Sequence, residues 1–409
     1  MFNWLQELSA TVRRELSQTF RSLRHRDYLT YSAGQLVSLT GTWMQTVALI
    51  WITYSLTQSA WILGLVGLCS NVPILTLSLF GGMVADRFNR RKVLIITQWL
   101  SMTLAVILGS LVFTHNLQVW MILALASIQG VISAFEVPCR QAIVSELVGG
   151  NDMVNAISLN SVIFNTTRMV GPAIGAVLLA SFGETICFAL NALSFVAALI
   201  TLYRLPEGTT PEAGENRQRP SILEGLKVVA ASPEIRNVLV LTAFTSLFGF
   251  QFAVLLPVFV KTVFHAEATT LGLLTSAAAF GSLAGSLLLA NRGKGPSLKR
   301  GITWAACGVA VTLFAFALSS SLTLTIFLEI LIGLSISIQL NSSNSLLQLS
   351  VPEELRGRVM SVYTMILLGI SPLGSVIIGR AADTFGAPLA VAFCAALCGV
   401  SALFYLTRK

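Results

Sequence analysis

The sequence predicts an all-α integral membrane protein with twelve transmembrane helices, arranged as two pseudo-symmetric bundles of six. Of its 409 residues, 55% are hydrophobic and 11% are charged, and the mean hydropathy is +0.78. This composition leaves too little polar surface to cover a soluble globule of that size. Apolar runs of about 20 residues match the ~30 Å thickness of the hydrocarbon core, and they are too continuous for the alternating strands of an outer-membrane barrel.

Polar clusters interrupt the apolar runs and define the expected helices in order. The first six helices are expected near residues 28–54, 60–84, 93–113, 118–138, 153–181 and 185–203. The second six are expected near residues 237–261, 270–290, 301–319, 322–347, 359–381 and 387–406. The predicted bundles therefore cover residues 28–203 and 237–409.

Residues 1–27 precede the first span and are amphipathic. Apolar side chains such as Trp4, Leu8 and Phe20 share this segment with arginines such as Arg13 and Arg24. The segment lacks an apolar core followed by a small-residue cleavage site, so it does not resemble a signal peptide. We expect a cytoplasmic helix that lies on an anionic membrane surface.

Residues 204–236 form the longest polar stretch after the N-terminal segment. They contain four prolines and mixed charges, which is typical of a linker. Within them, Ile222, Leu226 and Val229 recur at helical spacing and predict a short surface helix. We expect a cytoplasmic linker between the two bundles.

The basic residues indicate how the chain is oriented. If the N-terminal segment and the linker lie on the inner side, 23 of the 26 Lys and Arg residues fall on that side. Only Arg168, Lys261 and Arg380 do not. By the positive-inside rule, this asymmetry predicts a multi-pass protein of the cell inner membrane with both termini in the cytoplasm. The formal charge of +8 is then a signal of topology, and no nucleic-acid partner is expected.

Two parts of the sequence are similar and lie about 200 residues apart. Gly171-Pro172 followed by Phe182-Gly183 corresponds to Ser371-Pro372 followed by Phe385-Gly386. One half therefore looks like a relative of the other. In membrane proteins built from parallel repeats, the substrate binds between the halves near the middle of the membrane.

A dense charge cluster separates the second and third predicted helices. The cluster contains a glycine, an acid and three arginines at fixed spacing: Gly82, Asp86, Arg87, Arg90 and Arg91. This spacing resembles the signature loop of the major facilitator superfamily. Asn89 stands where that pattern has glycine. This is a mild change, because Asn tolerates the left-handed backbone conformation that a tight turn can require.

Three further segments are similar to the branch of the superfamily that contains the enterobactin exporter and macrolide-efflux proteins. They are residues 33–38, 351–361 and 369–374. The resemblance implies a secondary active exporter that works by alternating access and is driven by protons. Its cargo would be a small amphipathic molecule such as a siderophore, a drug or a metabolite. We expect a monomer whose partners are this substrate, protons and membrane lipids.

The resemblance also implies a gate. In the family, the loop acid, here Asp86, holds the two halves together on the inner face while the carrier faces outward. It does so by meeting the N-terminus of a helix of the second half, near Arg358. The predicted gating residues are Asp86, Arg87, Arg90, Arg91, Gly82 and Arg358. The alternative is that the arginines only fix the orientation in the membrane.

Polar side chains inside three of the predicted spans point to a shared cavity. An unpaired Arg in mid-membrane costs at least about 2.5 to 3.5 kcal/mol, so Arg168 should face the protein interior. The predicted substrate-binding residues are Arg168 and Asn165, Gln35 and Gln45, and Asn341 and Asn344. The alternative for each polar stripe is hydrogen bonding between packed helices.

Two acids are candidates for proton coupling. Glu329 is deeply placed in the tenth span, and Glu136 lies near the inner end of the fourth, where it can also pair with Arg140 four residues later. Asp383 and Arg380 are expected to form a pair on the outer surface.

No cofactor or metal is expected, because the three histidines lie at membrane edges and the six cysteines have no paired spacing. An alternative function is a lipid or lysophospholipid carrier of the same fold, in which Arg168 would meet a phosphate. A membrane-embedded enzyme of the acyltransferase type is disfavoured, because no His-Asp set or paired histidines occur at catalytic spacing. A receptor would explain the spans but not the signature loop.

Overall fold

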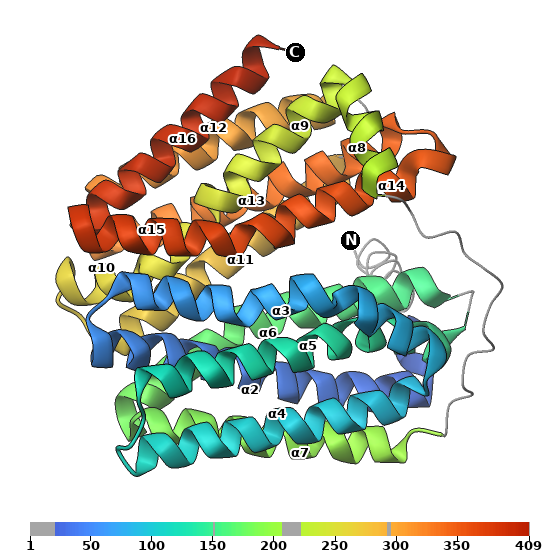
Figure 1. The fold of residues 1–409 in the computed structure, drawn as a ribbon, viewed down its shortest axis with the longest axis vertical. Coiled ribbons are helices and arrows are strands. Elements are labelled where there is room, and N and C mark those ends of the chain that lie inside the picture. The colour runs from blue at the N-terminus through green and yellow to red at the C-terminus, as the bar shows by residue number, and fades with distance from the viewer. Residues whose placement is uncertain (1–20, 150–151, 207–221, 293–295, 409) are drawn as a thin grey trace, which may run out of the picture.

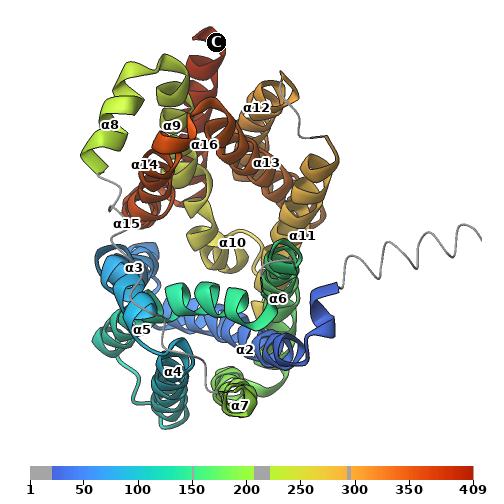
Figure 2. The same ribbon diagram turned by 90° about the vertical axis from the view of Figure 1, so that its right-hand side faces the viewer.

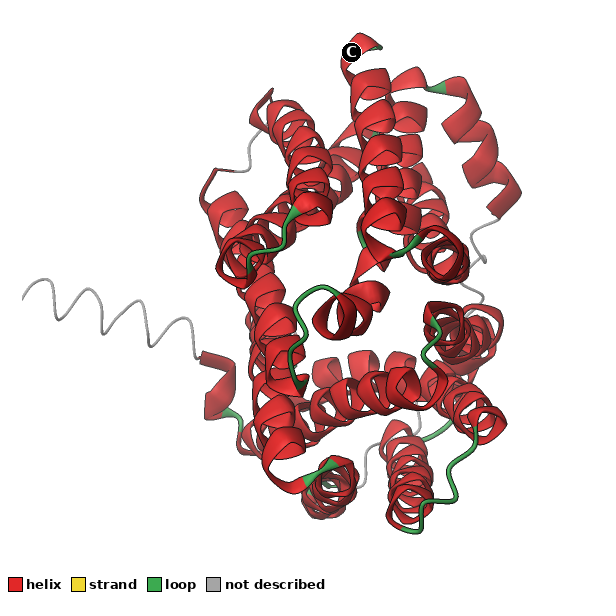
Figure 3. Ribbon diagram, turned by 90° about the vertical axis from the view of Figure 1, so that its left-hand side faces the viewer, coloured by secondary structure: helices red, strands yellow, loops and turns green. Residues whose placement is uncertain are grey.

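The computed structural model describes residues 21–149, 152–206, 222–292 and 296–408, and these ranges contain helices and no strand (Figures 1 and 3). Twelve stretches are long and apolar enough to cross a membrane. The predicted fold class and number of spans are therefore confirmed. Residues 1–20 of the predicted amphipathic segment lie outside the described residues.

The first half contains the first six spans. After a short 3-10 turn, η1 (Arg21–Arg24), these are α2 (Arg26–Thr57), α3 (Ala60–Arg87), α4 (Arg90–Phe113), α5 (Val119–Val148), α6 (Met153–Phe182) and α7 (Glu184–Arg204). Helices α3 and α5 pack together, and α2 packs against both α6 and α7.

The second half begins with the predicted surface helix, α8 (Ile222–Ala231). The seventh span follows in four pieces: α9 (Pro233–Phe244), η3 (Thr245–Gly249), η4 (Gln251–Leu255) and α10 (Leu256–Thr262). The next three spans are α11 (Ala268–Arg292), α12 (Pro296–Leu318) and α13 (Leu322–Ser350). The eleventh span consists of α14 (Glu353–Thr364), η5 (Met365–Ile370) and α15 (Ser371–Phe385), and the last span is α16 (Ala387–Thr407).

Local signals explain several helix boundaries, and one pair of them explains the sequence repeat. Gly183 between α6 and α7 has φ 80°, and Gly386 between α15 and α16 has φ 87°. Residues with a Cβ rarely adopt this conformation, so the same turn requires glycine at equivalent places in the two halves. Ser59 caps α3 by accepting a hydrogen bond from the Ile62 amide.

The two halves meet at one end of the molecule and are separate at the other. We call the end that carries Asp86 and α8 the linker end, and the opposite end the far end. In Figure 1 the far end is on the left, where α10 lies close to the first half. Viewed along the membrane-spanning direction, α10 lies between the two halves (Figure 2).

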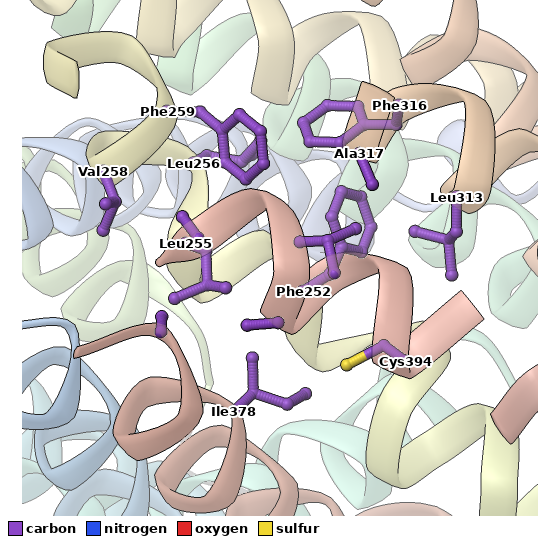
Figure 4. Close-up of a cluster of buried hydrophobic side chains, with 14 of the residues drawn as sticks. Phe252, Leu255, Leu256, Val258, Phe259, Leu313, Phe316, Ala317, Ile378 and Cys394 are labelled. Carbon is purple, nitrogen blue, oxygen red and sulfur yellow. The ribbon is translucent and has the colours of Figure 1, made fainter. Parts of the chain in front are cut away.

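The largest apolar core joins the halves at the far end. It combines Val47, Tyr54 and Leu63 of the first half with residues of the second half. Phe252 and Ile378 are two of these second-half residues, and Figure 4 shows them. At the linker end the apolar cores are separate: one contains only first-half residues, and the other contains only second-half residues. The five ion pairs found among the described residues likewise stay within one half.

Candidate substrate and gating sites

Two spans of the second half are interrupted near their middle, where the sequence predicted continuous helices. The seventh span passes through a π-turn, η3, and a 3-10 turn, η4, and the eleventh passes through the π-turn η5. Each interruption is followed by a proline in the first turn of the next helix, Pro257 or Pro372, which lacks the amide hydrogen of a regular helix. Such irregular turns are frequent at functional sites.

The two interruptions lie against each other. Ser246 donates a hydrogen bond through Oγ to the carbonyl oxygen of Leu367 at 2.7 Å, and the side chains of Gln251 and Ser371 are also bonded. These contacts fix the position of Phe250, which lies between η3 and η4. One face of its ring lies against Arg168 of α6, which belongs to the first half.

Arg168, on α6, is held between aromatic rings of both halves. Its guanidinium carbon lies 5.9 Å from the centroid of the Trp43 ring on α2 and 5.6 Å from that of Phe250. The structure therefore places Arg168 at the interface between the halves. Among the described residues, no carboxylate forms an ion pair with it. The sequence indicated Arg168 through the cost of a charge in the membrane, but it gave no signal for Trp43 or Phe250.

A polar pocket of about 190 Å³ lies inside the first half, beside Trp43. Its wall includes Gln35 and Thr42 of α2 and Gln129, Glu136 and Arg140 of α5. Glu136 and Arg140 form the predicted pair, with 3.5 Å between Oε1 and Nη1. Gln35 and Glu136 are thus brought to one pocket, whereas Arg168 does not line it.

The other predicted substrate-binding residues are engaged in helix packing or in their own helix. Gln45 accepts a hydrogen bond from Asn191 of α7 at 2.7 Å, and Asn165 donates to the Ser161 carbonyl one turn earlier. Asn341 donates to Ser286 of α11, while Asn344 is bonded to Gln348 of the same helix. The structure therefore does not gather the six residues into one site.

Glu329 lies on α13 and has no exposed surface. Neither of its carboxyl oxygens has a hydrogen-bond partner among the described residues. An ionised carboxylate without a partner is costly in such surroundings. Glu329 therefore differs from Glu136, which faces a pocket and has a cationic neighbour.

At the linker end, the signature loop makes its contacts within the first half. Arg90 pairs with Glu146, and Arg91 donates to the carbonyl oxygens of Leu202 and Tyr203 at 2.8 and 3.0 Å. Asn89 has φ −60°, so the turn does not use the left-handed conformation here. Its side chain instead caps α4 by accepting a hydrogen bond from the Lys92 amide at 3.1 Å.

The remaining gating candidates differ in how exposed they are. Asp86 and Arg87 are exposed, and within the described part of the chain the Asp86 carboxylate has neither a hydrogen bond nor an ion pair. A methyl group added at Gly82 would meet no atom within 4 Å. Arg358 is half-buried on α14, in the second half.

The far end contains an acid whose contacts the sequence did not predict. Asp383, at the end of α15, accepts hydrogen bonds from Ser59 Oγ at 2.6 Å and from the backbone amides of Ala60 and Trp61 at 2.7 and 3.1 Å. The predicted pair of Asp383 with Arg380 is therefore wrong. The N-terminus of α3 attracts the carboxylate, while the Arg380 guanidinium lies over the Trp61 ring at 5.7 Å.

Other contacts between the halves are also at the far end. Lys261 of α10 donates to Ser55 Oγ of α2 at 2.6 Å, and Ser375 of α15 donates to the Gly64 carbonyl of α3 at 3.0 Å. Together with the shared apolar core, these two bonds close the far end. Ser276 of α11 also donates to the Met169 carbonyl of α6 at 2.8 Å, nearer the middle of the spans and next to Arg168.

Two six-helix halves, closed at one end and carrying a cation at their interface, define a membrane transporter of the major facilitator type. Comparison with known proteins agrees. The structure matches a bacterial homologue of the human lysosomal transporter Spinster, with a TM-score of 0.75 and 16% identity over 94% of this chain and 96% of that one. At this identity, the likeness shows the fold.

The chain belongs to the transmembrane secretion effector family of that superfamily, which it matches over residues 17–409. It is 27% identical to the staphyloferrin A transporter of Staphylococcus aureus, covering 93% of this chain and 96% of that protein. It is 26% identical to the multidrug efflux pump Tap of Mycolicibacterium fortuitum (90% and 93% covered) and 23% identical to the enterobactin exporter EntS of Shigella flexneri (79% and 77% covered). The chain is therefore a secondary transporter of the efflux type and not an enzyme.

Proposed function

We propose that this protein exports a small amphipathic molecule by alternating access, in exchange for protons. The observation that carries the proposal is the uneven interface: contacts between the halves gather at the far end, while Arg168 lies between the halves nearer the middle of the spans. Rocking of the halves about such a central site would expose it to one side of the membrane at a time. The efflux relatives support a siderophore, a drug or a metabolite as cargo.

The protein is proposed to be a monomer in the inner membrane of the cell. Its linker end is proposed to face the cytoplasm. The positive-inside rule supports this orientation, because the basic residues of the signature loop and of α14 lie at that end. The two termini would then be cytoplasmic, and the structure would represent the state that is open to the cytoplasm.

In the opposite state, the gate at the linker end is proposed to close through Asp86. Its carboxylate would approach the N-terminus of α14, near Arg358, with Gly82 allowing close contact. A carboxylate at a helix N-terminus gains about 0.3 to 1 kcal/mol, which is weak enough to be broken in each cycle. Arg90 and Arg91 would hold the loop to the first half, as their present contacts do.

Glu329 and Glu136 are the proposed proton-coupling residues. Glu329 is supported by its complete burial and by its lack of a hydrogen-bond partner among the described residues, since such a site disfavours the charged form. Glu136 is supported by its place in the polar pocket beside Arg140.

The test is transport in liposomes that contain the purified protein. Enterobactin, erythromycin and lysophosphatidylcholine would be offered separately, with an imposed proton gradient. We expect gradient-driven movement of the siderophore or the macrolide, which a proton ionophore abolishes. Equal transport with and without the ionophore would exclude proton coupling, and movement of the lysolipid alone would favour the carrier alternative.

Glu329→Gln should uncouple transport from the gradient, because the amide cannot carry a proton. Glu234→Gln is the matched control: Glu234 is about half exposed and pairs with Lys299, 2.9 Å away. If both variants respond to the gradient like the parent, Glu329 is not the proton carrier.

A further inference from the structure

The charges at the interface between the halves are unbalanced. Arg168 and Lys261 both lie there, and neither forms an ion pair with a carboxylate of the described residues. Three acids lie nearby: Glu136 pairs with Arg140, Asp383 accepts three hydrogen bonds at the N-terminus of α3, and Glu184 at the start of α7 is close enough to attract Lys261. Arg168 therefore presents positive charge at the interface without a carboxylate partner among the described residues.

We propose that the transported molecule is an amphipathic anion whose acid group binds the guanidinium of Arg168. This inference rests on the proposed transport function and narrows its substrate class. A carboxylate or a phosphate matches the fork of guanidinium hydrogens and can form two parallel hydrogen bonds with it.

The hydrogen-bonding capacity of Arg168 supports an anion. A guanidinium carries five N–H donors, and no hydrogen bond from Arg168 to another described residue is found. Arg168 is only partly buried, so part of its surface remains accessible. The two aromatic rings attract the cation through their faces, but they do not supply the oxygen acceptors that its donors require.

The rings around Arg168 suit the apolar part of such a molecule. Trp43 comes from the first half and Phe250 from the second, so one ligand bound at Arg168 would contact both halves. Phe250 is about two-fifths exposed, which leaves apolar ring surface free for a ligand. A ligand that touches both halves can bias their relative position, which is what transport requires.

A second cation, Lys261, lies between Arg168 and the far end of the interface. Lys261 lies 4.8 Å from the ring centroid of Trp51 and 5.6 Å from that of Tyr54. Trp43, Trp51 and Tyr54 recur at helical spacing on α2, so one face of this helix presents aromatic rings to both cations. When the far end opens, Lys261 would be the next positive group that an acid leaving Arg168 meets.

Binding to the purified full-length protein tests this inference without a gradient or a transport cycle. The protein would be placed in phosphatidylcholine nanodiscs, and its thermal stability and tryptophan fluorescence would be followed during titration. The probes are 4-phenylbutyrate, its methyl ester and 4-phenylbutylamine, which share an apolar body and differ in charge. Oleoyl-lysophosphatidate and inorganic phosphate are added to separate a lipid phosphate from a free acid.

We expect the acids to raise the melting temperature and the ester and amine to leave it unchanged, because only a ligand bound to the folded state stabilises it. Stabilisation by phenylbutyrate would indicate a soluble carboxylate as cargo. Stabilisation by lysophosphatidate alone would indicate a lipid acid. Equal stabilisation by the amine would overturn the inference. So would the absence of stabilisation by every acid at concentrations up to about 100 mM, at which even a ligand with a dissociation constant of about 1 mM would stabilise the protein.

Arg168→Gln should weaken binding of the active acid at least about tenfold, since it removes a charge-assisted pair. Arg168→Lys should restore part of the affinity, because it restores the charge but not the fork. Arg380→Gln is the matched control, because Arg380 also lies over a tryptophan ring, 5.7 Å from the Trp61 centroid, but at the far surface. Unchanged affinity in Arg168→Gln would contradict the inference.

The comparison of acid, ester and amine on the parent protein remains valid if an Arg168 variant does not fold. The inference and the transport proposal can also fail separately. A protein that binds the acids but moves nothing in liposomes would disprove only the transport proposal. A protein that transports a cation with Arg168→Gln unaffected would disprove only the anion inference.

Discussion

Helix α3 has an aspartate at each of its two ends. One of these aspartates forms contacts between the halves, and within the described ranges the other does not. At the far end, Asp383 of the second half accepts three hydrogen bonds at the N-terminus of α3. At the linker end, Asp86 of the first half lies at the other end of α3, exposed and without such a contact among the described residues. An aspartate could therefore join the two halves at either end of α3, and in the part of the chain that the structure describes only Asp383 does so.

In the proposed transport cycle, this difference sets the relative stability of the state closed at the far end and the state closed at the linker end. An acid at a helix N-terminus is a modest interaction, so neither contact would lock the protein permanently. The far-end contact is reinforced by close helix packing, since Gly64 and Gly379 bring the backbones of α3 and α15 together. Changing the two ends separately should move the equilibrium in opposite directions.

The largest effect is expected from Gly379→Ala. A methyl group there would lie 2.4 Å from the Ala60 carbonyl oxygen, so α3 and α15 would have to separate. Overpacking of this kind costs about 1 to 3 kcal/mol, which would shift the population toward an open far end by roughly five- to 150-fold. The measurement is the labelling rate of a cysteine placed at Leu63, which is buried in the apolar core between the halves. Gly82→Ala is the control, and a parental rate in Gly379→Ala would contradict the prediction.

A smaller effect is expected from Asp383→Asn. The amide keeps an oxygen acceptor but loses the charge that the N-terminus of α3 attracts, a loss of about 1 to 2 kcal/mol at this exposed position. The far end should open more often, as measured by the same labelling reaction. Arg380→Gln, which leaves the three hydrogen bonds to Asp383 in place, should label like the parent. Equal labelling of both variants would exclude a latch at Asp383.

The smallest effect, and one of opposite sign, is expected from Asp86→Asn. Thermal stability of the present state should not change, because the carboxylate has no contact with another described residue to lose. The state closed at the linker end should become less populated by about 0.3 to 1 kcal/mol, so far-end labelling should slow by up to about fivefold. Faster labelling than in the parent would show that Asp86 does not favour closure.

The spans could be predicted from the sequence because each one must present about 20 apolar residues to lipid, whatever it packs against. Arg168 and Glu329 stood out for a related reason, since a charge in that environment is costly. The interruptions at Phe250 and at η5 were missed. Their apolar residues fit a regular helix equally well, and only Pro257 and Pro372 hinted at them.

The use of the polar residues could not be predicted, because it depends on which helices are neighbours. Gln45 and Asn341 look like cavity residues in the sequence, yet each bonds to a neighbouring helix. The contact of Asp383 with the α3 N-terminus joins residues more than 300 positions apart, so the nearby Arg380 was the natural but wrong partner. Local charge pairing succeeded only for Glu136 and Arg140, which share a helix turn.

The central claim is that the two ends close alternately, and distances between spin labels test it most directly. Labels would be placed at Phe88 and Leu349 for the linker end and at Phe113 and Phe385 for the far end, after the native cysteines are replaced by serine; all four positions are exposed. In nanodiscs, Gly379→Ala should lengthen the far-end distance and shorten the linker-end distance, each relative to its own parent pair. The account would be contradicted if the far-end distance lengthened while the linker-end distance stayed as in the parent.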